Sequence, residues 1–142
     1  MNSPVNGEAI MRSLDLVAEK CGDPAPFVYE RLFRQSPEMK PLFLSDTSNL
    51  AKGEMLFRVI ECFLDYAGPR AYAANLISSE LRNHDNLGVP PEVFATFFRT
   101  VMETFREIAG GDWTAEFDGA WSEMLQGLDR IVSDQAAAMS AA

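Results

Sequence analysis

The chain of 142 residues contains a single histidine, His84. An imidazole is a common metal ligand, but one histidine excludes any multi-histidine metal site. Glu80 lies four positions earlier, so a helix would place both side chains on one face. A two-residue Glu/His metal site is disfavoured, because ferritin-like di-iron sites use Glu-x-x-His twice with further glutamates. Taken alone, His84 is best interpreted as a surface or capping residue.

The remaining reactive residue types indicate no familiar catalytic centre. Cys21 and Cys62 stand far apart and form no Cys-x-x-Cys pair, so we expect two buried thiols in a reducing compartment. The sequence lacks G-x-S-x-G, H-E-x-x-H, a Walker loop and a dinucleotide fingerprint. These absences argue against the corresponding hydrolases, metalloproteases and nucleotide-binding enzymes.

The net charge limits the partners to be expected. A formal charge of −9 disfavours nucleic acid and anionic lipid, which are both polyanions. No run of about 18 apolar residues is present, so no membrane span is predicted. The segment Met1–Ile10 has neither a basic stretch nor an apolar one, so we expect a cytoplasmic location. Small molecules, cofactors and proteins remain as partners.

Apolar residues recur with the spacing of helices along most of the chain. Hydrophobic residues make up 47% of the sequence and include ten Phe, enough for a substantial core. No segment alternates with a period of two for long enough to predict a strand, so an all-α fold is predicted. The stripes comprise Ile10, Leu14, Val17 and Cys21; Met55, Leu56, Val59, Ile60, Phe63 and Leu64; Phe94, Phe97, Phe98, Val101, Met102, Phe105 and Ile108; and Phe117, Trp121, Met124, Leu125, Leu128 and Ile131.

Glycine and proline set the predicted helix ends within a single domain spanning residues 1–142. The boundaries are Gly22 to Pro24 after the first helix, Ser36 after the second, a short turn of possible 3₁₀ type from Pro37, a helix from near Leu50 to Gly68, a break from Gly88 to Pro91, and another from Gly110 to Asp112. Thr114 is the expected N-cap of the last helix. The alanine-rich tail, residues 136–142, is expected to fray.

Two segments carry a resemblance to a known family. The first comprises Val28–Phe33 (VYERLF) and Ser36–Phe43 (SPEMKPLF), and the second has the pattern His84-x₃-Gly88-Val89-x₄-Phe94. They resemble helices B and C, and the proximal histidine with the start of helix G, of single-domain bacterial haemoglobins and the haem domain of flavohaemoglobins. The resemblance runs from the first helix to about residue 134. It implies a globin fold of six to eight helices around a haem pocket.

The resemblance also implies a function and a set of site residues. His84 would be the proximal ligand to the iron of haem b (iron protoporphyrin IX), its other ring nitrogen donating to a carbonyl near Glu80. Tyr29 would point its phenol into the distal pocket beside bound O₂, NO or CO; the alternative is a tyrosine bonded to a backbone carbonyl. Phe43 would pack against the haem, with a plain core phenylalanine as the alternative. The implied cofactor-binding residues are Leu42, Phe43, Lys52, Leu56, Ile60, Asn83, His84, Val89, Phe94, Phe97 and Leu125, with Tyr29, Lys52 and Leu56 on the distal side.

The sequence departs from this family on both sides of the expected pocket. A one-residue shortening of the loop before it aligns Lys52 with the distal position that often holds His or Gln. The ammonium group could lie in solvent or on a haem propionate, donate to a distal ligand, or lose its proton and coordinate iron. Phe94 and Ala136 align with the Tyr and Glu that hydrogen-bond around the proximal histidine of flavohaemoglobins. That network is therefore expected to be missing.

Several functions stay open at this point. The favoured function is reversible binding of O₂. The sequence does not distinguish storage, NO scavenging and sensing, because one pocket could serve all of them. No flavin or nicotinamide reductase domain is expected within these 142 residues, so we expect NO dioxygenation to need an external reductase. The unusual Lys52 and the acidic charge motivate an alternative from another class, a haem-free globin-fold sensor or protein-interaction module. A generic helical interaction bundle is a third interpretation. The oligomeric state is open, with a homodimer among the alternatives.

Overall fold

The computed structural model describes residues 5–141, so the first four residues of the N-terminal segment and the last residue of the tail lie outside it. Over this range the chain forms helices and no strand, which confirms the predicted all-α fold. None of the described helices combines the length and apolarity needed to cross a membrane. The elements are α1 (Gly7–Cys21), α2 (Ala25–Gln35), the 3₁₀-helix η1 (Pro37–Phe43), α3 (Leu50–Ala67), α4 (Ala73–Asn86), α5 (Pro91–Ala109), the 3₁₀-helix η2 (Gly110–Asp112) and α6 (Ala115–Ala141).

The helix ends fall where glycine, proline and the capping threonine predict them. Gly22 and Gly110 follow α1 and α5 with φ of +71° and +58°, in the left-handed region that glycine adopts without strain. The hydroxyl of Thr114 accepts a hydrogen bond of 3.1 Å from the N–H of Phe117, which confirms the predicted N-cap. Residues 136–141, where we expected fraying, instead continue α6 as helix. Alanine has the highest helix propensity, and Ala136 and Met139 pack against the core.

The core is centred on Trp121 of α6, whose side chain is fully buried. Its ring lies 4.9 Å from that of Phe63 on α3 and 6.1 Å from that of Phe105 on α5, measured between centroids. The indole N–H donates to the hydroxyl of Ser13, which in turn donates to the carbonyl of Ile10. One aromatic side chain with a satisfied polar group therefore joins α1, α3, α5 and α6.

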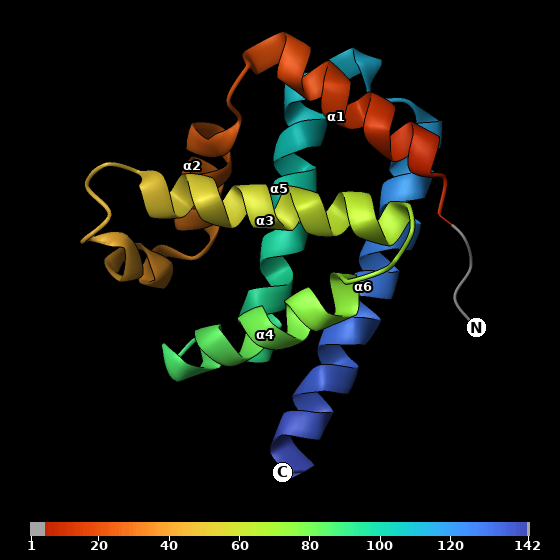
Figure 1. Ribbon diagram of the computed structural model, residues 1–142. Coiled ribbons are helices and arrows are strands. Elements are labelled where there is room, and N and C mark those ends of the chain that lie inside the picture. Colours follow the sequence, from red (N-terminus) through yellow and green to blue (C-terminus); the bar gives the residue numbers. More distant parts are fainter. Residues whose placement is uncertain (1–4, 142) are drawn as a thin grey trace.

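The helices leave space for a pocket beside this core rather than within it. In Figure 1, α3 crosses α5, and α1 lies across one end of both α5 and α6. The rings of Phe63 and Phe98, 5.9 Å apart, hold α3 against α5 at the crossing. Helix α4 packs against α3 and α6, while η1 packs against α2. Four elements, η1, α3, α4 and the first half of α5, thus surround a region away from Trp121.

Asp65, buried near the end of α3, fixes where α4 begins. Its carboxylate accepts hydrogen bonds from three successive backbone N–H groups, those of Ala71 (3.0 Å), Tyr72 (3.0 Å) and Ala73 (2.7 Å). The first N–H groups of a helix have no partner within the helix, so a side-chain acceptor at this place stabilises the start of α4. This contact sets the position of the helix that carries His84.

Candidate functional site

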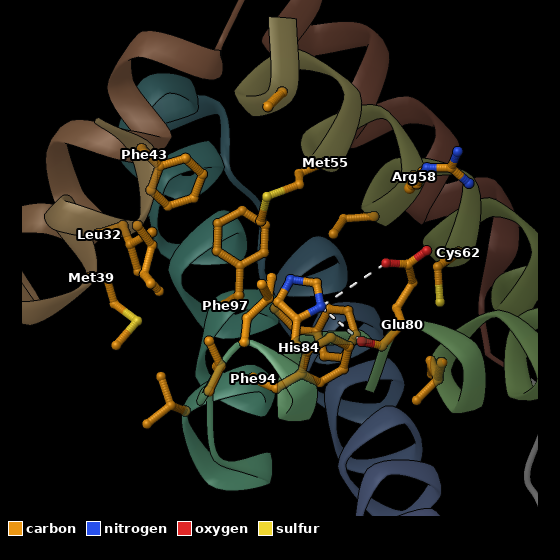
Figure 2. A pocket seen from close by; sticks show the side chains of 18 of the residues that line it. Leu32, Met39, Phe43, Met55, Arg58, Cys62, Glu80, His84, Phe94 and Phe97 are labelled. Carbon is orange, nitrogen blue, oxygen red and sulfur yellow. Dashed lines mark hydrogen bonds and ion pairs between the residues drawn. The ribbon is translucent and has the colours of Figure 1, made fainter. Parts of the chain in front are cut away.

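A cavity of about 280 Å³ lies among η1, α3, α4 and α5. This volume is just below the usual range for small-molecule sites, roughly 300–1,000 Å³. Figure 2 shows the lining side chains, with His84 near the centre. Most of the lining is apolar: Leu32, Met39, Leu42, Phe43, Ala51, Met55, Val59, Cys62, Leu76, Ile77, Leu87, Val89, Val93, Phe94, Phe97 and Phe98. The polar lining residues are Ser45, Asp46, Arg58, Glu80 and His84.

His84 is held in one orientation by its own helix. Its Nδ1 lies 2.7 Å from the carbonyl oxygen of Glu80, which confirms the predicted contact one turn earlier. Because a carbonyl oxygen can only accept, this contact places the ring proton on Nδ1 and leaves the lone pair on Nε2. Figure 2 shows the second ring nitrogen directed away from Glu80, toward the side of the cavity where Met55 lies. The edge-on ring of Phe94, 5.1 Å away between centroids, supports the imidazole.

The sulfur groups that line the cavity are weaker metal donors than this imidazole. Cys62 also lines the cavity, but burial, with a smaller effect of the nearby Asp65 charge, raises the pKa of its thiol to about 12. The thiolate form that binds metals is therefore almost absent at neutral pH. Met39 and Met55 offer only neutral thioethers. The donor set thus fits a group that needs one neutral imidazole within an apolar wall.

Aromatic rings form the end of the cavity next to η1. The ring of Phe43 lies 5.5 Å from the rings of both Tyr29 and Phe33, and Tyr29 lies 5.8 Å from Phe97, all between centroids. Phe43 and Phe97 line the cavity, whereas Tyr29 and Phe33 stand behind them. This cluster gives the cavity an aromatic, apolar wall at that end.

Tyr29 does not point into the cavity in this structure. Its hydroxyl donates a hydrogen bond of 2.9 Å to the carbonyl of Lys52, which is the alternative that the sequence left open. Burial, followed by the nearby Asp46 charge, raises the pKa of the phenol above its ordinary value. The group therefore remains a protonated donor at neutral pH. It ties α2 to the first turn of α3.

Lys52 lies in the first turn of α3 and does not line the cavity. Its ammonium nitrogen is 3.5 Å from Asp46 Oδ2, 3.2 Å from Asn49 Oδ1 and 5.5 Å from the centroid of the Phe43 ring. The aliphatic stem is covered and the charge is paired at the molecular rim, since the side chain is 17% exposed. The ammonium is therefore paired with Asp46 and Asn49 outside the lining of the cavity.

Asp46 makes the first turn of α3 sensitive to acid. It accepts N–H hydrogen bonds of 3.0 Å from both Ala51 and Lys52. Burial is the largest single effect and opposes ionisation, but these bonds and the Lys52 ammonium together hold the pKa of Asp46 below its ordinary 3.8. A lowered pKa means that the contribution to stability is present above pH 3.8 and is lost as the pH falls through the folded-state pKa.

We therefore expect the backbone amide signals of Ala51 and Lys52 to titrate with a midpoint below 3.8 in an NMR pH series. The Asp46→Asn variant should lose this titration, because its side chain cannot ionise. A midpoint at or above 3.8 in the unmodified protein would contradict the proposed capping role.

The structure brings together only part of the residue set implied by the resemblance. Leu42, Phe43, His84, Val89, Phe94 and Phe97 line the cavity; Lys52, Leu56, Ile60, Asn83 and Leu125 do not. On α3 the cavity is instead faced by Ala51 and Met55, one residue earlier than Lys52 and Leu56. Leu56 is 4% exposed and belongs to the core. Because one residue turns a helix by about 100°, a one-residue difference in the length of the preceding loop moves a different face to the cavity.

Sequence reasoning also missed several lining residues. Met55 and Val59 belong to an apolar stripe that was recognised, so the correct face of α3 was contained in the pattern. Glu80 was recognised as a neighbour of His84 on one helix face, but Arg58 carried no such sign, because a charged residue on a helix is usually solvated. Leu87 and Val93 lie next to the Gly88 to Pro91 break, where no periodicity is available.

Comparison with known proteins agrees with this geometry. A family model described as Globin matches residues 26–131, which include every element around the cavity. The chain is 22% identical over 112 residues to a flavohemoprotein of Vibrio cholerae serotype O1, an alignment that covers 78% of this chain and 28% of that protein. It thus spans little more than a quarter of the relative's length. No solved structure matches. Since the family match covers well over half of its length, the chain belongs to the globin family.

Proposed function

We propose that the cavity binds haem b with His84 as the protein ligand to iron, and that the protein reversibly binds O₂ there. The observation that carries this proposal is the orientation of His84. Its Nδ1 is engaged by the Glu80 carbonyl, so the nitrogen with the free lone pair is the one directed into the apolar cavity. When bound, the haem would supply the ferrous iron at which a diatomic gas coordinates.

The lining residues fit a flat apolar cofactor. Phe43 and Phe97 would contact the cofactor from the end of the cavity next to η1. Val89 and Phe94 would contact it from the side of His84. Arg58 lines the cavity with its side chain 47% exposed, so its guanidinium can meet a carboxylate substituent at the rim. The apolar walls exclude water, which slows oxidation of the ferrous state. These residues bind, orient and shield the cofactor.

Hemin titration of the purified protein tests this function. We expect uptake of one hemin per chain, a sharp Soret band, and a further shift of the band when the sample is reduced under carbon monoxide. A protein that takes up no hemin would overturn the proposal. That outcome would favour the haem-free sensor or interaction module.

Tyr29→Phe tests the part of the phenol in gas binding. Removing the hydroxyl loses the hydrogen bond to the Lys52 carbonyl, so we expect a decrease of about 1 kcal/mol in the free energy of unfolding. If the phenol stays on that carbonyl, the dissociation rate of O₂ should change by less than about twofold. A dissociation rate that rises tenfold or more, equivalent to about 1.4 kcal/mol, would show that Tyr29 turns to the bound gas instead. Chemical denaturation and stopped-flow absorbance measure the two effects separately.

The relation to a flavohemoprotein supports one second candidate, oxidation of NO to nitrate by O₂. That reaction needs one electron per cycle, which would come from an external reductase. Sustained NO consumption that depends on an added reductase would support this candidate, whereas consumption limited to one equivalent per haem would count against it.

A further inference from the structure

The carboxylate of Glu80 lies beside His84 in the cavity, at a position that the resemblance to flavohaemoglobins did not point to. The resemblance described above would assign a hydrogen-bonding Tyr and Glu to the positions where this chain has Phe94 and Ala136. Phe94 stacks edge-on against His84 and has no polar group to offer. Glu80, on the same helix as His84, places its Oε2 4.0 Å from Nδ1.

On this basis we propose that the Glu80 carboxylate acts as the anionic partner of the His84 imidazole and increases its electron donation to iron. The inference rests on the proposed haem function and deepens it. Two acceptors from one residue then face the same ring nitrogen: the carbonyl at 2.7 Å, which takes the hydrogen bond, and the carboxylate at 4.0 Å, which adds a negative charge. Figure 2 shows both converging on Nδ1.

Helix geometry explains why a single helix can supply this partner. Residues four apart lie on one face of a helix, so the Glu80 side chain and the His84 ring are neighbours along α4. The Asp65 cap fixes the start of the same helix, and Phe94 holds the other side of the ring. The pair therefore needs no contribution from α6, where the corresponding position is Ala136.

The surroundings leave the charge of Glu80 effective at the imidazole. The side chain of Glu80 is 27% exposed and that of His84 is 19% exposed, so water screens their interaction only in part. Arg58, the cation that lines the same cavity, is paired with Glu54 at 3.0 Å. Lys52 is paired with Asp46. Among residues 5–141, the His84 ring is the one basic side chain within 4.0 Å of the Glu80 carboxylate.

A negative charge beside Nδ1–H gives the imidazole more imidazolate character, which strengthens its bond to iron and favours the ferric state. Glu80 is a positioning residue in this scheme, because it acts through His84. The quantities to measure are the iron–histidine stretching frequency of the reduced holoprotein, by resonance Raman spectroscopy, and its midpoint potential. A merely structural role would leave both unchanged.

The decisive variant is Glu80→Gln. It keeps the shape of the side chain and the hydrogen bond between the backbone carbonyl of residue 80 and His84, but it removes the charge. We expect a lower stretching frequency and a reduction equilibrium shifted toward the ferrous form by about tenfold, which for a one-electron couple is about 59 mV. Glu80→Asp keeps the negative charge but places it farther from the ring. Its stretching frequency and midpoint potential should therefore lie between those of the unmodified protein and those of Glu80→Gln. Asp85→Asn removes a charge from the neighbouring position without a contact to the ring, and it should change either quantity far less.

The outcomes separate this inference from the function on which it rests. An unmodified protein that takes up no hemin would overturn the proposed function, and this inference with it. If the unmodified protein binds hemin but Glu80→Gln leaves frequency and potential unchanged, only the tuning role is overturned. Equal shifts in Glu80→Gln and Asp85→Asn would overturn it as well, because they would indicate a general effect of net charge.

Discussion

Replacing His84 with alanine is expected to abolish specific hemin binding while the helices stay folded. His84 is the chain's only histidine, and the sulfur donors in the cavity are a protonated thiol and two thioethers. Without the imidazole, only apolar contacts would retain the cofactor, so we expect hemin affinity to fall by at least about a hundredfold, or about 2.7 kcal/mol. Hemin titration followed at the Soret band measures the loss.

Two controls make this result specific to the imidazole. Asn83→Ala changes the preceding residue, which is exposed and does not line the cavity, and it should bind hemin as the unmodified protein does. His84→Gly supplied with free imidazole should recover a spectrum close to that of the unmodified protein, because the small ligand can fill the vacated position. A His84→Ala protein with undiminished affinity and an unchanged spectrum would refute the assignment of the ligand.

The second large effect is expected at Asp65, which contacts the start of α4, the opposite end of that helix from His84. Asp65→Ala removes the acceptor for three backbone N–H groups at the start of α4. Leaving a buried donor unpaired costs about 1–3 kcal/mol. Ala71 and Tyr72 are exposed and can bond to water, whereas Ala73 is buried, so we expect a total loss of about 2–4 kcal/mol in the free energy of unfolding.

Urea denaturation measures this loss, and a matched variant tests its cause. Asp65→Asn keeps one carbonyl oxygen as an acceptor and should lose less stability than Asp65→Ala. Asp85→Ala, at an exposed position near the other end of α4, should change the free energy of unfolding by less than about 0.5 kcal/mol. If Asp65→Ala were no more harmful than Asp85→Ala, the carboxylate would not be what holds the start of α4.

Features set by local sequence were predicted well. The ends of the helices follow from glycine, proline and Thr114, because these residues act on the backbone within one or two turns. The contact between His84 and the Glu80 carbonyl follows in the same way from the spacing of one helical turn. The end of α6 is the exception, since residues 136–141 continue as helix. There, helix propensity and the packing of Ala136 and Met139 outweigh the tendency of a terminus to fray.

Features that depend on how distant segments meet were not predictable in the same way. Which face of α3 lines the cavity depends on the path of the loop at residues 44–49, and this path brings Ala51 and Met55 inward instead of Lys52 and Leu56. The Tyr29 hydroxyl finds the Lys52 carbonyl only after α2 packs beside α3. The carboxylate of Glu80 gains its role from the burial of α4 against the cavity. Sequence spacing alone could not weigh that burial against a solvated position.

The most direct test of the central claim uses the fact that His84 is the only histidine. The reduced holoprotein is prepared twice, once with histidine of natural isotope content and once with ¹⁵N-labelled histidine, and the low-frequency resonance Raman spectra are compared. If His84 binds the iron, an iron–histidine stretching band is present and moves to lower frequency on labelling. The absence of such a band, or a band that does not move, would contradict the account.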